Sequence, residues 1–349
     1  MKNILLIATG GTIASAEDGN GLSPSLTGEQ LAEAVPEIAS LAHIGILQLM
    51  NIDSTNMRPR DWLRISSAIV EAYDAYDGFV VLHGTDTMAY TAAALSYLIQ
   101  DSPKPIVLTG SQKPMCDSFT DAKLNLYQSL LYATDERSRD VVIVFNGAVI
   151  AGTRGRKQRT MSFNAFKSVN YPSIAYVRND RIIRSGDALA RAQGLAASNL
   201  APTTMPHFFT TLDERVFVLK LTPGIDPSIF GLLESNYDAV ILETFGIGGI
   251  PEYEGATSGS PSFRQAIFDW IDSGRTAVVT TQVPEEGLDL GVYEVGRAYA
   301  DHPGILKGDD MTTEALVAKT MWARGQSSDP DEIKRLFYRP VNFDRLPPL

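Results

Sequence analysis

Short apolar runs alternate with helical patterns along the first half of the chain, and this alternation limits the possible folds more than any other feature. The runs are rich in branched residues, which is typical of strands buried on both faces of a parallel sheet. They are 4–8, 44–49, 79–82, 106–109 and 141–145. Between them, apolar residues recur at three- and four-residue steps over 62–76, 88–98 and 124–131, which predicts helices. Strands and helices in alternation predict a doubly wound α/β fold.

The alternation resumes in smaller form after an irregular stretch at 179–213. Strands are predicted at 216–221, 239–242 and 277–280, and helices at 229–233, 263–271 and 315–322. A length of 349 residues also favours two domains. We therefore predict a larger N-terminal α/β domain with a mostly parallel sheet over 1–185, a connection over 186–212, and a smaller C-terminal α/β domain over 213–349.

The chain is acidic, with 30 Lys and Arg against 41 Asp and Glu and a formal net charge of −11. Binding to a phosphate backbone needs clustered basic residues, so we expect no nucleic-acid partner. One basic group is the exception, and its simplest interpretation is a solvated loop: Arg154, Arg156, Lys157 and Arg159. No stretch approaches the roughly 20 apolar residues that span a bilayer, so we also expect no membrane association.

Cys116 is the only cysteine, which excludes an intrachain disulfide and a multi-cysteine zinc site. The four histidines show no metal-ligand spacing, so we expect no metal site. The apolar run at the start of the chain is too short for a secretory signal and leads directly into Thr9–Gly11. We interpret it as a first buried strand and expect a cytoplasmic protein.

Three small, hydroxyl-rich clusters follow the first three predicted strands directly. They are Thr9–Ser15, Ile52–Asn56 and His83–Met88. In an open parallel sheet, ligands bind beyond the carboxyl ends of the strands. The three clusters therefore predict one binding crevice.

The first cluster combines adjacent glycines with a hydroxyl. Gly10 and Gly11 let the backbone approach a bound group, and amides there can stabilise an oxyanion. The dinucleotide pattern G-x-G-x-x-G and the P-loop lysine are both missing from this segment. Thr12 is then either a displayed nucleophile or a cap or turn residue.

The third cluster also leaves alternatives open. Thr85 and Asp86 precede a predicted helix, and Asp86 either caps that helix or takes part in catalysis. His83 follows four apolar residues and is better interpreted as an interior histidine than as a base.

Two interpretations, one structural and one functional, are possible for each of Asp53, Ser54 and Lys157. A turn explains Asp53 and Ser54, but the pair also suits a small zwitterion, with Asp53 taking an ammonium group and Ser54 a carboxylate. Lys157 is either a surface charge or a proton shuttle beside a threonine and an aspartate. Pattern alone does not choose between these roles.

Two motifs resemble the signatures of the bacterial asparaginase/glutaminase family, and the chain is most similar to the cytoplasmic type I members. These motifs are Thr9–Ser15 and His83–Thr91. Further similar segments, spread over nearly the whole chain, are 49–57, 73–80, 109–112 and 293–297.

The resemblance implies an enzyme of asparagine catabolism that cuts the side-chain amide of L-asparagine into L-aspartate and ammonia without a cofactor. It implies a larger N-terminal and a smaller C-terminal α/β domain. It also implies a homodimer or homotetramer with its sites near the subunit interface. Asparagine and glutamine differ by one methylene, worth only about 1–3 kcal/mol in a pocket, so the sequence leaves their ratio open.

The resemblance also implies residue roles. Thr12 matches the nucleophile that forms an acyl-enzyme. Thr85, Asp86 and Lys157 match a triad that passes protons and positions water, Lys157 being matched through its spacing to 163–166. On the substrate side, Asp53 and Ser54 match the pair that holds the α-amino and α-carboxylate groups, the backbone near Ser111 is expected to face the side-chain amide, and Gly11 is expected to contact substrate.

The chain departs from the family pattern in two places. Many relatives carry a tyrosine in the loop after the first motif, whereas 17–24 has none, so another group assists Thr12 or the loop only closes the site. Some type I enzymes bind asparagine at an allosteric site that uses a cysteine and a positive residue. Val283 and Glu243 stand at those positions here, so we expect no allostery of that kind.

Two rival functions remain. The amidase subunit of a tRNA-dependent amidotransferase shares this domain pair but usually carries an extra N-terminal domain, for which a first motif at Thr9 leaves no room. A non-catalytic amino-acid-binding protein on the same fold is the second rival. The full set Thr12, Thr85, Asp86 and Lys157 argues against it.

Overall fold

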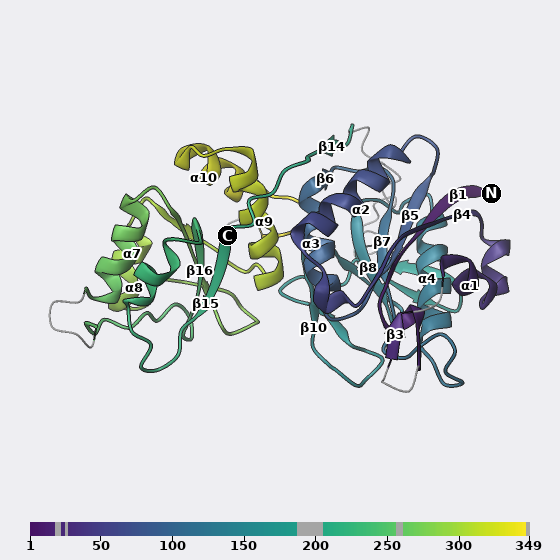
Figure 1. The fold of residues 1–349 in the computed structure, drawn as a ribbon, viewed down its shortest axis with the longest axis horizontal. Coiled ribbons are helices and arrows are strands. Elements are labelled where there is room, and N and C mark those ends of the chain that lie inside the picture. The colour runs from purple at the N-terminus through teal and green to yellow at the C-terminus, as the bar shows by residue number, and fades with distance from the viewer. Residues whose placement is uncertain (18–21, 25–26, 187–204, 256–260, 347–349) are drawn as a thin grey trace. The chain divides into compact units, whose positions relative to one another are not determined.

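The computed structural model describes residues 1–17, 22–24, 27–186, 205–255 and 261–346, which form two compact units (Figure 1). The N-terminal unit holds Met1–Thr210 together with Val341–Phe343, and the C-terminal unit holds Thr211–Pro340 and Asp344–Leu349. The boundaries predicted at 185 and 213 stay a prediction, because most of the connection between them, 187–204, lies outside the described residues.

An eight-stranded sheet forms the centre of the N-terminal unit, in the order β13-β12-β9-β8-β7-β5-β1-β4. Its parallel part comprises β1 (Lys2–Gly10), β4 (Ala42–Ile52), β5 (Gly78–Leu82), β7 (Ile106–Thr109) and β8 (Val141–Phe145). These are the five strands predicted from the apolar runs, and β5, β7 and β8 are buried along their whole length. The prediction of a mostly parallel α/β sheet is confirmed.

The strand order places the site. Along the chain, the parallel strands occupy the positions 2-1-3-4-5, so the direction of winding reverses between β1 and β5. A crevice opens at such a switch point, beyond the carboxyl ends of the strands. The polar clusters that follow β1 and β5 lie on either side of it.

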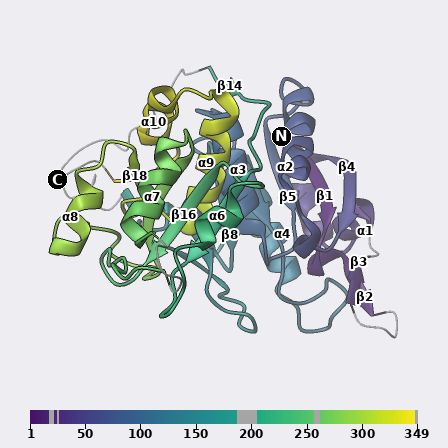
Figure 2. The ribbon, with the colours of Figure 1, turned by 60° about the vertical axis from the view of Figure 1, so that its left-hand side comes forward.

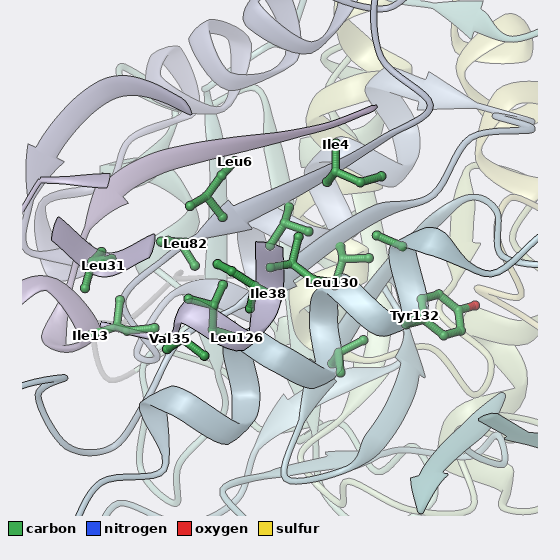
Figure 3. Packing of buried hydrophobic residues seen from close by; sticks show 14 of the residues in the cluster. Ile4, Leu6, Ile13, Leu31, Val35, Ile38, Leu82, Leu126, Leu130 and Tyr132 are labelled. Atoms are coloured by element: carbon green, nitrogen blue, oxygen red, sulfur yellow. The ribbon is translucent and has the colours of Figure 1, made fainter. Parts of the chain in front are cut away.

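One face of the sheet packs against α4 (Ala122–Thr134), α1 (Gly28–Glu33) and the 3-10 turn Pro36–Ser40. Alternate strand residues such as Ile4, Leu6 and Leu82 point into this core, where they meet Leu126 and Leu130 of α4 (Figure 3). All five side chains are fully buried. Each such side chain contributes roughly 1.5–3 kcal/mol by leaving water.

The opposite face is covered by α2 (Pro59–Glu71) and α3 (Met88–Leu98). The apolar pattern predicts a helix as far as residue 76, but α2 ends at Glu71. Tyr73 continues the apolar spacing without continuing the helix, because its ring stacks on Phe79 with centroids 5.8 Å apart and its hydroxyl lies 2.6 Å from Ser102 Oγ. Tertiary packing therefore explains the extra apolar positions.

Three antiparallel strands extend the sheet beyond β8: β9 (Ala148–Ala151), β12 (Ala175–Arg178) and β13 (Arg181–Arg184). Asn179 and Asp180 join β12 to β13 with φ values of 45° and 58°. Two left-handed residues are the conformation that a tight two-residue hairpin requires. The sequence predicts an irregular stretch from 179 onward, and its beginning is instead a hairpin.

Three two-stranded ribbons complete the N-terminal unit. They pair β2 (Ser15–Glu17) with β3 (Leu22–Pro24), β10 (Gly155–Lys157) with β11 (Phe166–Ser168), and β6 (Ile99–Gln100) with β14 (His207–Phe208). Of these, β10 matters most for the site because it ends at Lys157.

The C-terminal unit contains a four-stranded parallel sheet in the order β15-β16-β17-β18. Two of its strands, β16 and β18, are labelled in Figure 2. Its strands are β15 (Val216–Lys220), β16 (Ala239–Thr244), β17 (Thr276–Thr281) and β18 (Ile305–Lys307). Its helices are α6 (Ile229–Leu233), α7 (Phe263–Asp272), α8 (Glu294–Ala300), α9 (Thr313–Gln326) and α10 (Pro330–Tyr338). The smaller α/β domain predicted from the sequence is confirmed. In neither unit is any described helix long and apolar enough to cross a bilayer.

Candidate active site

The carboxyl ends of β1, β4 and β5 meet through glycines. Gly10 and Gly11 have φ values of 106° and 81°, which side-chain-bearing residues rarely adopt. A Cβ on Gly11 would lie 2.3 Å from Gly84 N, and one on Gly10 would lie 2.4 Å from Ile52 O. Gly11 N donates to Ile52 O over 3.0 Å. The three polar clusters predicted from the sequence are therefore in direct backbone contact at the carboxyl edge of the sheet.

Thr12 opens the 3-10 turn Thr12–Ala14 that follows this contact. Ala14 N donates to Gly11 O over 3.0 Å, which closes the turn. Thr12 is half-buried, whereas Ile13 and Ala14 are fully buried and anchor the turn to the core. The arrangement leaves the Thr12 side chain partly accessible at the end of β1.

Asp53 and Ser54 start the next cluster. Asp53 is the N-cap of the 3-10 turn Ser54–Asn56, and its Oδ1 accepts bonds of 2.8 Å from both N and Oγ1 of Thr55. Its side chain is exposed, while Ser54 is buried and its Oγ lies 2.5 Å from where a Cβ on Gly84 would stand. The turn interpretation of Asp53 is thus correct, and it leaves the carboxylate at the sheet edge where a ligand would bind.

The cluster after β5 contains the closest polar contacts. Lys157 Nζ donates to Thr85 Oγ1 and to Asp86 Oδ1, each over 2.7 Å. Thr85 is buried at 5% exposure, and the Lys157 side chain is 17% exposed against 58% for Asp86. An ion pair with so exposed a partner contributes little stability, so its importance is that it fixes the position of the lysine.

Two secondary-structure elements hold this group in place. Residues 158 and 159 both donate backbone bonds to Ala165 O, and Lys157 pairs with Phe166 across the β10–β11 ribbon. The Phe166 ring packs against Phe145 with centroids 5.0 Å apart, which ties the ribbon to the end of β8. On the other side, the N-cap of α3 is Thr87. Asp86 is therefore not the cap that one interpretation predicted, and its carboxylate faces Lys157 instead.

His83 is an interior residue. It is fully buried, its Nδ1 lies 2.7 Å from Gly84 O, and its Nε2 lies 2.9 Å from Thr91 Oγ1. Since the carbonyl only accepts, Nδ1 carries the proton and Nε2 accepts from the threonine. Burial lowers the pKa of His83 from 6.5 to about 4. Its imidazole is therefore neutral and braces the turn that presents Thr85.

The end of β7 is the fourth strand end that borders the site, beside those of β1, β4 and β5. A Cβ on Gly110 would lie 2.2 Å from His83 O, so this strand end also lies directly against the cluster after β5. Ser111 is buried, and its hydroxyl donates to Lys113 O in a short bond. With the Ser111 side chain occupied by its own turn, its backbone is the part left to face a ligand.

This arrangement matches a known family over most of the chain. Residues 3–188 match the family described as "Asparaginase, N-terminal", and residues 215–337 match the "Glutaminase/Asparaginase C-terminal domain". The chain belongs to the asparaginase family. Its members hydrolyse amides, and the chain is an enzyme of that kind.

Individual asparaginases are similar along their whole length. An L-asparaginase of Thermococcus kodakarensis is 36% identical over 344 residues, covering 97% of each chain. L-asparaginase 1 of Escherichia coli K12 is 32% identical over 353 residues, covering 99% of this chain and 98% of the relative. A glutamyl-tRNA(Gln) amidotransferase polypeptide of Metallosphaera sedula is 34% identical over 95% of this chain, but the match covers 74% of that relative.

Solved asparaginase structures share the fold. The thermostable L-asparaginase of Thermococcus kodakarensis superposes with a TM-score of 0.86 at 34% identity, covering 99% of this chain and all of the other. L-asparaginase I of Vibrio cholerae has a TM-score of 0.83 at 29% identity, covering 99% of each chain. The family assignment and the two-domain fold therefore rest on agreement over both units.

The basic group around Lys157 is only in part the solvated loop that its charge predicts, because Arg159 is exposed but Arg154 is not. Arg154 is fully buried, where its Nε donates to Phe343 O over 2.5 Å and its guanidinium lies 5.6 Å from the Tyr171 ring centroid. Arg159 donates to Asn164 O over 3.0 Å. The positive charges thus stabilise the segment that carries Lys157.

Gln112 is a polar residue of the site that the sequence patterns do not predict. Thr85 Oγ1 donates to its Oε1 over 3.3 Å, and its Nε2 donates to Arg159 O and Ser162 O. The residue lies in a segment that resembles the family, but a glutamine in a loop has no pattern that would reveal such contacts. Part of the loop that lacks tyrosine, 18–21, lies outside the described residues. Among the described residues, no group of three or more His, Cys, Asp or Glu side chains is arranged to hold a metal ion.

Proposed function

We propose that this chain is an L-asparaginase that hydrolyses the side-chain amide of L-asparagine to L-aspartate and ammonia. The observation that carries the proposal is the contact of Lys157 Nζ with both Thr85 and Asp86, 2.7 Å each, at the strand ends that also present Thr12. Full-length similarity to L-asparaginases supports the same substrate.

In the proposed first step, Thr12 Oγ1 attacks the carbon of the substrate amide. An amide is a poor electrophile, so the reaction is easier when divided into acylation and deacylation. The hydroxyl proton passes to the leaving nitrogen, ammonia departs, and an aspartyl ester of Thr12 remains. Backbone amides beside Gly11 are the donors best placed to stabilise the oxyanion, because the glycines allow close approach.

In the second step, water hydrolyses the ester and regenerates Thr12. Thr85 and Lys157 take up and return protons in this scheme, and Asp86 holds the lysine. Positioned acid–base groups typically contribute a factor of about 10²–10⁴ to the rate. The mechanism uses side chains and backbone amides of the protein alone.

The substrate is proposed to be held at its α-carbon end by Asp53 and Ser54, with the carboxylate of Asp53 facing the ammonium group. The backbone at Ser111 is proposed to contact the amide. Support comes from their places at the ends of β4 and β7, on the same sheet edge as Thr12. Because Ser54 is buried and packed against Gly84, its hydroxyl has a fixed position from which to bind a carboxylate.

Ammonia release by the purified chain tests this function. We expect fast release from L-asparagine and slower release from L-glutamine in the absence of any partner protein. Release only after a second subunit and a charged tRNA are added would instead support an amidotransferase subunit. Binding of asparagine without any turnover would support a non-catalytic amino-acid-binding protein.

We also propose that the enzyme acts in the cytoplasm as a homodimer or homotetramer. The resemblance to type I asparaginases is the basis for both proposals. Light scattering on the eluting peak of a size-exclusion column measures the assembly directly, and a monomeric mass would contradict it.

A further inference from the structure

Gln112 joins the buried hydroxyl of Thr85 to a loop on the other side of the site. Its Oε1 lies 3.3 Å from Thr85 Oγ1. Its Nε2 lies 3.3 Å from Arg159 O and 3.2 Å from Ser162 O. The side chain is half-buried, and both ends of its amide are engaged.

The two carbonyl groups decide which way the amide points. Arg159 O and Ser162 O can only accept hydrogen bonds, so they must face the NH2 end of Gln112. The opposite orientation would bring three acceptor oxygens together. The carbonyl oxygen of Gln112 therefore faces Thr85, and this oxygen can only accept.

Thr85 has one proton and two lone pairs to distribute. When Lys157 is charged, its Nζ can only donate, and at 2.7 Å it occupies one lone pair of Thr85 Oγ1. The proton is then directed to Gln112 Oε1. One lone pair is left, and it is the part of Thr85 available to a reacting group.

We propose that Gln112 is a positioning residue that fixes the direction of the Thr85 hydroxyl proton, so that Thr85 presents a lone pair to the reacting group. The inference rests on the proposed function, in which Thr85 acts on the hydroxyl or water that reacts. Before any proton moves, the remaining lone pair of Thr85 accepts a hydrogen bond from the reacting O–H and so orients it. Without Gln112, the Thr85 hydroxyl spends part of its time with its proton toward the reacting group, where it donates instead of accepting and misorients that O–H.

The backbone of Gln112 is fixed well enough for this role. Its N donates to both carboxylate oxygens of Asp121 over 3.0 and 3.1 Å, and Lys113 N donates to Oδ1 over 3.1 Å. Asn125 Nδ2 donates to Asp121 Oδ2 over 3.1 Å and to Gly110 O over 2.9 Å. Asp121 is itself buried. The turn that carries Gln112 is thus held from α4, independently of the Gln112 side chain.

Two substitutions separate the two ends of the Gln112 amide. Gln112→Met removes the acceptor toward Thr85 and the donors toward the loop. Gln112→Glu keeps an acceptor oxygen for Thr85 but removes the donors. Loss of one hydrogen bond corresponds to about a tenfold change in rate, so we expect kcat for asparagine to fall about tenfold in Gln112→Met. We expect kcat of Gln112→Glu to lie well above that of Gln112→Met, and KM to change less than twofold in both.

The controls address folding and the loop. Gln265→Met, at an exposed position on α7, should leave kcat and Tm unchanged. Should Gln112→Met fail to fold, Gln112→Leu provides the same test with a smaller apolar side chain. Proteolysis between 159 and 162 reports on the loop by itself.

Three results would overturn the inference. Equal losses of kcat in the Glu and Met variants would mean that Gln112 only braces the loop, and so would a loss confined to KM. An unchanged kcat in Gln112→Met with active wild-type enzyme would remove the role altogether. Wild-type protein that releases no ammonia from asparagine would instead contradict the proposed function, and the inference would fall with it.

Discussion

Lys157 Nζ donates to Thr85 Oγ1 over 2.7 Å, although the two residues are 72 positions apart in the chain. The contact depends on two features of the fold. The turn after β5 presents Thr85, and the β10–β11 ribbon carries Lys157 back to it. A short ribbon placed outside the main sheet thus supplies a residue to the crevice at the sheet edge.

Replacement of Lys157 tests the importance of this contact. We expect Lys157→Met to lower kcat by about 10²–10⁴ with a much smaller change in KM, because the lysine moves protons and does not hold the substrate. Lys157→Arg should not restore the rate, since a planar guanidinium does not give up its proton near neutral pH. Steady-state ammonia release measures both parameters. Lys167→Met, exposed on the paired strand, is the matched control, and equal losses in the two methionine variants would contradict the proposal.

The buried His83 predicts a loss of stability in acid. Its pKa is about 4 in the folded protein and 6.5 when exposed, so the unfolded state binds more protons between these values. The neutral His83 therefore makes its full contribution to the free energy of unfolding above pH 6.5, and this contribution is lost as the pH falls to 4. The free energy of unfolding decreases by about 3 kcal/mol over this range, because one pKa unit corresponds to about 1.36 kcal/mol.

Urea unfolding at several pH values between 7 and 4 measures this effect. His83→Gln should flatten the acid decline relative to wild type, whatever its stability at neutral pH. His43→Gln changes an exposed histidine and should retain the full decline. The same decline in all three proteins would show that His83 does not cause it.

The last described residues of the N-terminal unit predict a difference between two small substitutions. Asn342 has φ of 46°, and its Nδ2 donates to Ser96 Oγ over 2.9 Å and to Val141 O over 2.8 Å. Asn342→Gly loses these bonds but keeps the left-handed backbone, whereas Asn342→Ala loses the bonds and adds strain. We expect the Ala variant to be less stable than the Gly variant by about 1 kcal/mol. Thermal unfolding measures both, and an Ala variant as stable as the Gly variant would contradict this.

The rate is expected to depend hyperbolically on asparagine concentration. Glu243, at the end of β16, accepts a bond of 2.5 Å from Thr313 Oγ1. A carboxylate in place of a positive residue repels the α-carboxylate of asparagine, so an activating molecule should not bind there. Initial rates over a wide concentration range test this, and a sigmoidal curve would count against it.

Sequence predicted the elements with strong, local patterns. Four of the five parallel strands of the larger sheet have continuous apolar runs because both of their faces are buried, whereas the edge strand β4 is mostly half-buried. The carboxyl ends of β1, β4 and β5 bring the three polar clusters together. By contrast, β12 alternates buried and exposed residues, and β13 alternates half-buried and exposed ones. Each pattern covers only four positions, which is too short to recognise, and the sequence that follows has no hydrophobic periodicity. Strands as short as β12 and β13 form only because they pair with neighbouring strands of the sheet.

The candidate site shows the same division. Thr12 and Thr85 lie in motifs directly after strands, so their position along the chain makes them candidates, and the family resemblance implies their roles. The contact of Lys157 with Asp86, and the burial of Arg154 against Phe343, join segments that no local pattern relates. Gln112 could not be predicted for the same reason, since its importance lies in the orientation of one amide between a hydroxyl and two carbonyl groups.

The most direct test of the account is the intact mass of the enzyme quenched in acid within milliseconds of mixing with L-asparagine. We predict a population heavier by one aspartyl group, with the added mass on the peptide that contains Thr12. We also predict that Thr12→Ala shows no adduct and releases almost no ammonia. A Thr12→Ala variant that turns over asparagine at the wild-type rate would contradict the assignment of Thr12 as the nucleophile.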